Sequence, residues 1–265
     1  MPARYPERIV CLTEETTETL YLLGEERRIV GISGYTVRPP RARREKPRIS
    51  AFLSAKTGKI VELRPDLVLG FSDLQADISK DLVKAGLNVV IFNQRSVGEI
   101  LNMVLVLSSL VGQNEKGLAL VGSLEKNLSD VRENAKALKR RPRVYFEEWD
   151  EPMISGIRWV SELIEIAGGE DVFSERSFSQ NAAGRIVRSQ DVLKEQPDVI
   201  LGSWCGKKFR PERAAARAGW GAIPAVRDGE LHEIKSSEIL QPGPAALTDG
   251  VRRIHERLAA WATRR

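Results

Sequence analysis

Aromatic side chains stand at several predicted strand ends in this chain. In the first half Phe71 ends a strand and Tyr35 follows one, while Trp149 and Trp204 follow strands in the second half. Ligands of open α/β sheets bind beyond the carboxyl ends of the strands, and aromatic faces bury a large area at a small entropic cost. The pattern therefore predicts a site for a large, flat, partly apolar ligand, with ordinary core packing as the alternative.

The tryptophans are confined to the second half of the chain. They stand at positions 149, 159, 204, 220 and 261. We expect Trp149 and Trp204 to line the site. Trp159 fits either the site or the core, and we expect Trp220 and Trp261 to belong to the core or the surface.

Cys205 directly follows Trp204 and could act as a nucleophile if a base lay beside it. The chain offers His232 and His255 as bases. Zinc sites take three or four ligands, usually several of them His or Cys, so two histidines argue against a metal centre. We expect a Cys205 that lines the binding site, and no metal.

Glu147 and Glu148 lie at the end of a predicted strand, with Asp150 two residues further on. Such carboxylates could act as acid and base or hold a cation. We favour an acidic loop that binds a polar ligand group or faces water. The sequence contains neither a GxGxxG nor a Walker loop. We therefore predict a binding protein and not an enzyme.

The composition is that of a soluble chain with a mixed surface. Its 265 residues include 41 basic and 36 acidic side chains, which gives a net charge of +5 and a pI of about 9.3. The densest basic cluster, Arg38–Arg48, contains three prolines and indicates a surface loop, so we expect no nucleic-acid partner. A secretory signal and any run of about 18 apolar residues are missing, which predicts a cytoplasmic protein without membrane insertion.

A long amphipathic helix at about 114–139 organises the chain. Its apolar residues recur every three or four positions. On either side lies nearly the same segment, ELRPDLVLG at Glu62–Gly70 and KEQPDVILG at Lys194–Gly202. We predict an α/β protein of two similar lobes, 1–113 and 141–265. Parallel-rich sheets flanked by helices form each lobe, the helix at 114–140 joins them, and a ligand cleft lies between them.

Apolar runs and turn signals give the expected elements. In the first half we predict strands at 8–12, 28–33, 67–71 and 89–92, helices at 16–23, 57–63, 77–85 and 96–110, and a loop at 35–48. In the second half we predict strands at 143–148, 199–203 and 231–234, helices at 160–166, 189–194, 211–218 and 244–263, and an irregular segment at 170–187. Short apolar strands between helices are typical of parallel sheets covered on both faces.

Several segments resemble one known family. Arg8–Gly24 looks like its opening strand, loop and helix, with Thr17-Glu18 at the usual Thr-Glu pair. The segments Val30–Tyr35 and Trp159–Gly169, the two Pro-Asp strands and the central helix also fit. Over residues 8–262 the chain resembles the helical-backbone (class III) substrate-binding proteins of ABC importers, and specifically their vitamin B12 (cobalamin) branch.

The resemblance implies a corrinoid ligand such as cobalamin, held between the lobes by aromatic residues. Phe52 stands where a tryptophan is usual, and the segments 203–208 and 240–246 look like a cobalamin-binding subgroup, which favours cobalamin over siderophores. Together with the strand-end argument, the expected ligand contacts are Tyr35, Phe52, Phe71, Trp149, Trp159, Trp204, Cys205, Gln241 and Pro242.

One departure from the family concerns the membrane permease. Importer-linked members carry an exposed glutamate on each lobe that pairs with permease arginines, but Gly58 and Gln190 stand at these positions. Loss of charge-assisted pairs weakens docking. We therefore favour a cytoplasmic corrinoid-binding protein that does not serve an importer. The alternatives are a periplasmic importer component for cobalamin, siderophore or haem whose leader was removed, and an enzyme acting through Cys205 or through Glu147 and Glu148.

Overall fold

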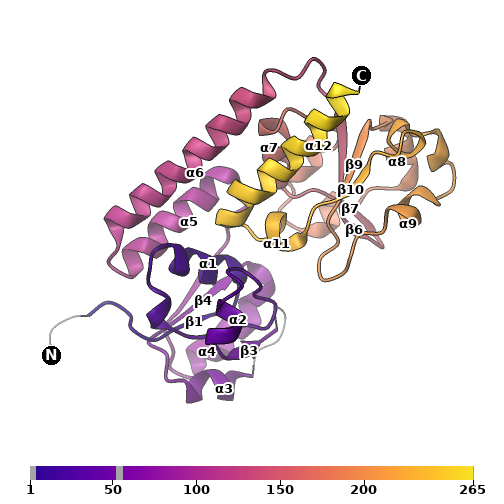
Figure 1. Cartoon of the computed structure of the whole chain (residues 1–265). Helices are drawn as coiled ribbons and strands as arrows, with labels where there is room; N and C mark the ends of the chain where they lie inside the picture. The colour runs from indigo at the N-terminus through magenta and orange to yellow at the C-terminus, as the bar shows by residue number, and fades with distance from the viewer. Residues whose placement is uncertain (1–3, 52–55, 265) are drawn as a thin grey trace. The chain divides into compact units, whose positions relative to one another are not determined.

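The computed structural model describes residues 4–51 and 56–264, which form two compact α/β units (Figure 1). Unit 1 comprises the residues up to 94 together with 98–123, and unit 2 comprises 95–97 and the chain from 124 onward. The division falls inside helix α6 (Asn114–Ala135), because Val121 belongs to unit 1 while Leu124 and Leu128 are buried in unit 2. The helix we expected to be a separate connector is therefore shared between the units.

Unit 1 contains a five-stranded parallel sheet in the order β3-β2-β1-β4-β5. Its strands are β1 (Ile9–Cys11), β2 (Ile29–Ser33), β3 (Arg48–Ser50), β4 (Leu67–Phe71) and β5 (Val89–Phe92). Its helices are α1 (Glu14–Leu22), α2 (Ala42–Glu45), α3 (Thr57–Glu62), α4 (Ala76–Lys84) and α5 (Val97–Leu110), with 3-10 turns at Glu26–Arg28 and Asp73–Gln75.

The core of unit 1 lies where helices cover the sheet. All five residues of β4 are buried, as expected for a parallel strand that is covered on both faces. One cluster joins β1 and β4 to the helices and comprises Val10, Leu12, Ile49, Ile60, Val68 and Leu82. The predicted strands at 67–71 and 89–92 are confirmed with the same bounds.

Unit 2 contains a second five-stranded sheet, in which strands β10, β9, β6 and β7 are neighbours in that order. Strand β8 pairs with the first residues of β6, and only the β6–β7 pair is antiparallel. The strands are β6 (Arg143–Asp150), β7 (Met153–Ser155), β8 (Glu170–Asp171), β9 (Val199–Gly202) and β10 (Leu231–Glu233).

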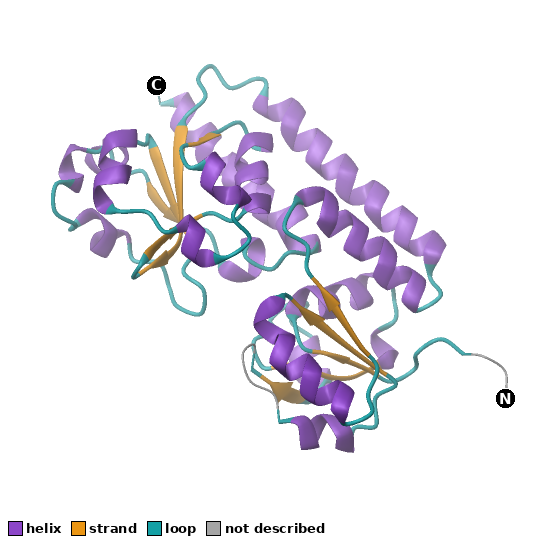
Figure 2. Ribbon diagram, turned by 180° about the vertical axis from the view of Figure 1, so that it is seen from behind, coloured by secondary structure: helices purple, strands orange, loops and turns teal. Residues whose placement is uncertain are grey.

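Helices flank this sheet as well (Figure 2). They are α7 (Arg158–Ile166), α8 (Ser189–Glu195), α9 (Pro211–Ala215), α10 (Pro224–Arg227), α11 (Ser236–Ile239) and α12 (Val251–Thr263). Single turns occur at Ser174–Phe178, Ala182–Arg185 and Trp220–Ala222, and a π-helical turn at Ala246–Gly250 leads into α12. The predicted α/β class with parallel-rich sheets is confirmed in both units.

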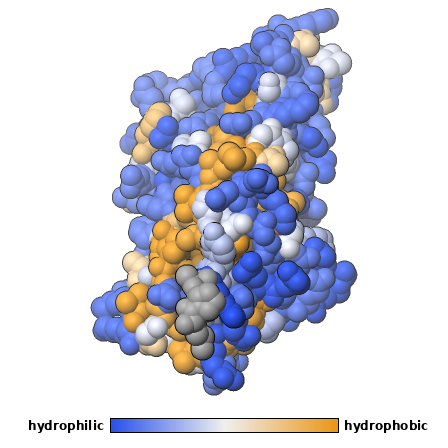
Figure 3. All heavy atoms as spheres, turned by 90° about the vertical axis from the view of Figure 1, so that its left-hand side faces the viewer, coloured by the Kyte–Doolittle hydropathy of each residue, from blue (hydrophilic) through white to orange (hydrophobic). Residues whose placement is uncertain are grey.

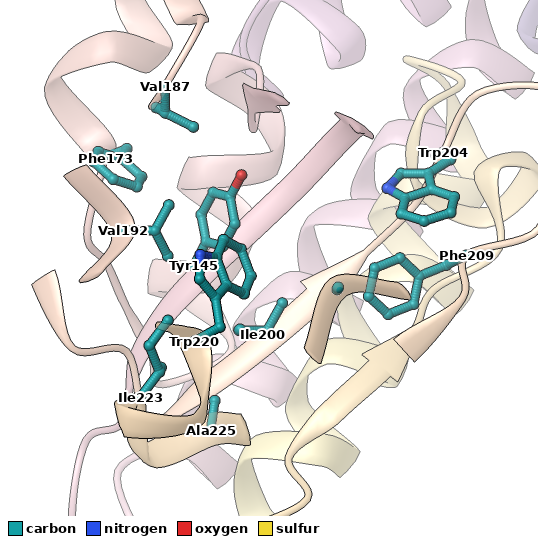
Figure 4. Close-up of a cluster of buried hydrophobic side chains, with 11 residues drawn as sticks. Tyr145, Phe173, Val187, Val192, Ile200, Trp204, Phe209, Trp220, Ile223 and Ala225 are labelled. Carbon is teal, nitrogen blue, oxygen red and sulfur yellow. The ribbon is translucent and has the colours of Figure 1, made fainter. Parts of the chain in front are cut away.

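Aromatic rings dominate the core of unit 2 (Figure 4). Tyr145 on β6 meets Phe173 edge-on at 5.6 Å between ring centroids, and Trp220 at 6.3 Å. Trp204 meets Phe209 edge-on at 5.0 Å. Edge-to-face pairs of this kind are favourable beyond the area that they bury. These rings fix the loops that leave the sheet, including the one that follows β9.

The duplicated sequence segments form the same local structure in both units. Arg64 and Gln196 each precede the proline of a Pro-Asp turn, and each adopts a left-handed conformation, with φ of 45° and 46°. A short helix leads into each turn, and a buried strand follows it. The repeat seen in the sequence is therefore a repeat of helix, turn and strand.

Several predicted boundaries change where tertiary pairing decides them. Helix α2 and strand β3 occupy part of the segment predicted as a loop at 35–48. The predicted helix at 114–139 ends at Ala135, and the strand predicted at 143–148 runs to Asp150 because β7 pairs with its end. The segment at 170–187, predicted as irregular, contains β8.

The molecular surface is mostly hydrophilic on the face shown in Figure 3, with hydrophobic side chains gathered in limited areas. Leu22, Val106 and Leu118 are among the apolar residues with exposed side chains. Within residues 4–51 and 56–264, no helix combines the length and apolar character needed to cross a membrane.

Candidate ligand-binding site

A buried carboxylate organises the carboxyl edge of the unit 2 sheet. Glu147, near the end of β6, has no exposed surface. It accepts hydrogen bonds from Trp204 Nε1 at 3.0 Å, from the Tyr145 hydroxyl at 3.0 Å, and from the Arg217 guanidinium at 2.5 and 3.0 Å. A buried charge with a close partner and further hydrogen bonds is well compensated. Glu147 therefore ties β6, the loop after β9 and the chain after α9 into one network.

Trp204 and Trp159 are part of the core and do not form an open wall. Trp204 is 2% exposed and Trp159 is 3% exposed. Trp204 is held by Glu147 and Phe209, while Trp159 Nε1 donates to the carbonyl of Ile239 at 2.9 Å. The structure thus gives both residues the core role that we considered as the alternative, because loops distant in sequence cover them.

Trp149 is the tryptophan of this edge that remains partly open. Its Nε1 donates to the carbonyl of Glu151 at 2.9 Å. The ammonium of Lys207 lies 4.1 Å from the centroid of the Trp149 ring and 5.2 Å from that of Trp204. Cations are attracted to aromatic faces at such distances. Lys207 therefore covers a face on which we expected a ligand to stack.

Asp150 ends β6 and is paired with two cations. Its carboxylate lies 2.5 Å from Lys207 Nζ and 3.8 Å from the Arg213 guanidinium. Desolvation acts to raise the pKa of Asp150, but the Lys207 hydrogen bond and charge, together with Arg213, hold that pKa below its ordinary value. Lys207 and Arg213 were not among the residues predicted to form the site. The sequence signal that could have found Lys207 is the Lys207-Lys208 pair, which closely follows Trp204.

The enzyme alternative finds little support in the geometry. Cys205 is exposed, but desolvation and the Glu148 carboxylate raise the pKa of its thiol, so thiolate is scarce at neutral pH. The two histidines are engaged elsewhere, His232 with Glu230 at 3.0 Å and His255 with the carbonyl of Ala167 at 3.0 Å. Neither histidine that the sequence offered as a base is therefore placed to serve Cys205.

Glu148 also serves a structural ion pair. The buried Arg185 donates to its two carboxylate oxygens at 2.6 and 3.0 Å, and to the carbonyl of Ser155 at 2.6 Å. A bidentate pair of this kind fixes both side chains. The carboxylates proposed in the enzyme alternative, Glu147 and Glu148, therefore hold strands and loops together.

Unit 1 has its own candidate edge at the carboxyl ends of β1 and β4, where the strand order reverses. Ligands of open α/β sheets bind at such switch points. Ser72, directly after β4, is buried and has φ of 67°, an unusual conformation for a residue other than glycine. Tyr35 follows β2 and is 62% exposed, so its ring is available to a ligand.

Two buried carboxyl groups lie beside this edge, at the start of α1. Burial raises the pKa of Glu14 to about 8 and that of Glu15 to about 7. Glu14 accepts from the Val37 backbone N–H at 2.5 Å, and Glu15 accepts from the Thr13 hydroxyl at 2.6 Å. One oxygen of each carboxyl has no partner among the described residues. Neither glutamate was predicted to be part of a site, although the Thr-Glu-Glu run after the first strand was visible.

The remaining predicted contacts divide by burial. Phe71 and Pro242 are buried, whereas Gln241 is partly exposed. Phe52 lies outside the described residues. In the described part of the chain, no three His, Cys, Asp or Glu side chains are grouped to hold a metal ion.

A cavity of about 400 Å³ lies at the opposite end of the unit 2 sheet. Arg143 at the start of β6 and Glu195 at the end of α8 are among its lining residues, and they form an ion pair at 2.6 Å. The strand ends that carry Trp149 and Lys207 are not part of this lining. The candidate site in unit 2 is therefore the carboxyl edge of the sheet, where the Trp149 ring is partly open, and not this cavity.

Two α/β units with parallel-rich sheets that share a long helix define a two-lobed fold with a helical backbone. Residues 9–238 match the family described as periplasmic binding protein, and the chain belongs to this family. The predicted family membership is therefore confirmed.

Relatives in the family carry names of ABC transport and vitamin B12 binding. The chain is 24% identical over 260 residues to a Bacillus subtilis protein named uncharacterized ABC transporter substrate-binding lipoprotein YvrC, with 95% of this chain and 79% of the relative covered. It is 26% identical over 253 residues to a vitamin B12-binding protein of Vibrio parahaemolyticus, with 91% and 86% covered.

Solved structures share the fold. The vitamin B12-binding protein BtuF of Vibrio cholerae has a TM-score of 0.76 and 24% identity, with 99% of this chain and 100% of that chain covered. The haem-binding protein RhuT of Roseiflexus sp. RS-1 has a TM-score of 0.81 and 22% identity, with 95% and 99% covered. At such identities the likeness establishes the fold alone.

Proposed function

We propose that this chain is a binding protein for a corrinoid of the cobalamin type. The observation that carries the proposal is the match to the periplasmic binding protein family over residues 9–238, joined by relatives named for vitamin B12. The partly open Trp149 at the end of β6 and the exposed Tyr35 after β2 support it, because both offer rings to a flat ligand at a carboxyl edge. Haem is the competing ligand, since RhuT shares the fold.

The test is a titration of the purified chain with hydroxocobalamin, cobinamide and haemin, followed by absorbance and calorimetry. Saturable binding of a corrinoid below about 10 µM, an affinity typical of a specific small-molecule site, is expected. Absence of a signal for both corrinoids at tens of micromolar would end the cobalamin proposal. Binding of haemin alone would transfer the proposal to haem.

Transport is the second part of the proposal. An importer role agrees with the name of the Bacillus relative. A role outside an importer is favoured by Gly58 and Gln190, which lie exposed in the first turns of α3 and α8, where the importer-linked pattern has carboxylates. Without those charges, docking to permease arginines loses its charge-assisted pairs.

Two measurements separate the transport roles. Fractionation of the source cells locates the protein, and a pull-down tests whether a permease is retained by the wild-type chain. Retention that strengthens in the Gly58→Glu, Gln190→Glu double variant would indicate an importer component with weakened docking. A cytoplasmic protein that retains no permease in either form would support storage or delivery.

A further inference from the structure

Two partly exposed cations stand at the edge around Trp149, where Asp150 and Glu151 are acidic neighbours. The Asp150 carboxylate, with a side chain only 4% exposed, faces both Lys207 and Arg213. The single Asp150 carboxylate is therefore shared between two cations. The side chains of Lys207 and Arg213 are 39% and 57% exposed and can reach a ligand from solution.

The loop that presents Lys207 is anchored at both ends, by Trp204 and by Phe209. Trp204 and Phe209 are buried, and their ring centroids lie 5.0 Å apart. Gly206, between them in the sequence, adopts φ of 78°. The exposed turn therefore projects from a fixed base, and a preorganised turn reduces the entropic cost of binding. Among the residues that the structure describes, Lys208 in this turn has no hydrogen-bond or ion-pair partner.

Lys207 places a positive charge directly against the Trp149 ring. Its ammonium lies 4.1 Å from the centroid of the Trp149 ring. An acidic group that met this ammonium would bring the rest of a flat ligand against the same indole. Lysine donates strong hydrogen bonds to carboxylate and phosphate oxygens. Neutral amide groups would gain much less from this ammonium.

We propose that Lys207 and Lys208 form a subsite for an acidic substituent, a carboxylate or a phosphate, on the ligand that stacks near Trp149, while Arg213 stays beside Asp150. This inference rests on the proposed function and narrows it. Among flat ligands of similar size, the chain selects those with an acid at the rim over their esters or amides, so the preferred corrinoid keeps a free acid where cobalamin itself carries a neutral amide. Lys207 then has two partners in turn, Asp150 in the free protein and the acid in the complex.

The experiment compares ligand pairs that differ only in the acid. Haemin is measured against its dimethyl ester, and a cobalamin with one peripheral amide hydrolysed to a carboxylate is measured against cobalamin. Dissociation constants are determined at 50 and 500 mM salt for wild type, for the Lys207→Met, Lys208→Met double variant, and for Lys84→Met. The last variant is the matched control, because Lys84 is an exposed lysine on α4 in unit 1. Circular dichroism checks that each variant is folded.

We expect wild type and Lys84→Met to bind the acid form about tenfold more tightly at low salt, since one charge-assisted hydrogen bond has roughly that effect. The double variant should bind both forms alike. Competition by inorganic phosphate or by acetate at matched ionic strength then assigns the group as phosphate or carboxylate.

Three outcomes would overturn the inference. Equal binding of the acid and neutral forms by wild type removes the subsite and leaves the proposed function intact. A preference for the acid that survives in the double variant places the anion contact on other residues. Failure of all four ligands to bind removes the proposed function and the subsite together.

Discussion

The Asp198 carboxylate accepts a hydrogen bond from the backbone N–H of Arg143 at 3.0 Å, and the Asp198 N–H donates to the Arg143 carbonyl at 2.8 Å. Asp66 and Arg8 repeat this exchange in unit 1, at 2.9 Å for both bonds. In each unit the aspartate of the Pro-Asp turn thus fixes the start of the first strand beside the strand that follows the turn. The duplicated sequence segment thus encodes the same pair of hydrogen bonds in both units. We call this pair of hydrogen bonds the Pro-Asp joint.

Truncating this joint should destabilise the fold. We expect Asp198→Ala to lower the free energy of unfolding by about 1–3 kcal/mol, because the Arg143 N–H loses its partner. Urea denaturation measures the change. Asp130→Ala is the control, since Asp130 forms an exposed pair with Lys126 and should change stability by less than about 0.5 kcal/mol. Equal effects of the two variants would show that the joint is not needed.

Trp204 should contribute mainly to stability, and Trp149 mainly to ligand binding. Trp204→Ala removes a buried ring and leaves Glu147 without one donor, so we expect a loss of about 3–5 kcal/mol of stability. Trp149→Ala should cost less stability and weaken ligand binding more. Thermal unfolding combined with ligand titration of both variants checks this. A stable Trp204→Ala protein that no longer binds ligand would return Trp204 to the site.

The buried carboxyl groups of α1 should make stability depend on pH. The pKa of Glu14 rises from 4.5 to about 8 and that of Glu15 from 4.5 to about 7, chiefly through burial. Between pH 4.5 and these raised pKa values, the two carboxyl groups keep their protons in the native state but lose them in the unfolded state. Stability from these groups is therefore complete below about pH 4.5 and is lost as the pH rises through about 7 to 8.

We expect the free energy of unfolding to fall by on the order of 2–4 kcal/mol across this window. Denaturant unfolding at pH 5.5, 7 and 8.5 measures the slope. Glu14→Gln and Glu15→Gln should each flatten it, whereas Glu212→Gln, which changes an exposed side chain, should not. A slope that is unchanged in both of the first variants would show that other groups titrate.

Gly202 allows the loop after β9 to pack. A Cβ at this position would overlap the Phe209 ring, whereas a Cβ on Gly221 would meet open space. We expect Gly202→Ala to cost about 1–3 kcal/mol through overpacking and to weaken ligand binding, because Phe209 anchors the turn that carries Lys207. Gly221→Ala should be near neutral. Chemical denaturation and titration of the two variants provide the comparison.

Local sequence patterns were sufficient to predict the repeated α/β architecture. Apolar runs such as Leu67–Phe71 and Val89–Phe92 define buried parallel strands locally, and the two Pro-Asp segments predicted equivalent joints. The resemblance in the opening segment and the central helix was sufficient to identify the family. These features depend on residues close in sequence, which is why pattern reasoning found them. The predicted cleft between the lobes stays a prediction, since each unit is described by itself.

Which strand-end residues are open depends on contacts between distant segments. Trp149 lies at the end of β6 and Trp204 follows β9, yet only Trp204 is enclosed, because Phe209 and Glu147 contact it from separate elements. Lys207 gained its place over Trp149 through Asp150, a partner 57 residues away in sequence. Periodicity reports which face of a strand is apolar, but the burial of one ring depends on loops that meet only after the sheet has formed.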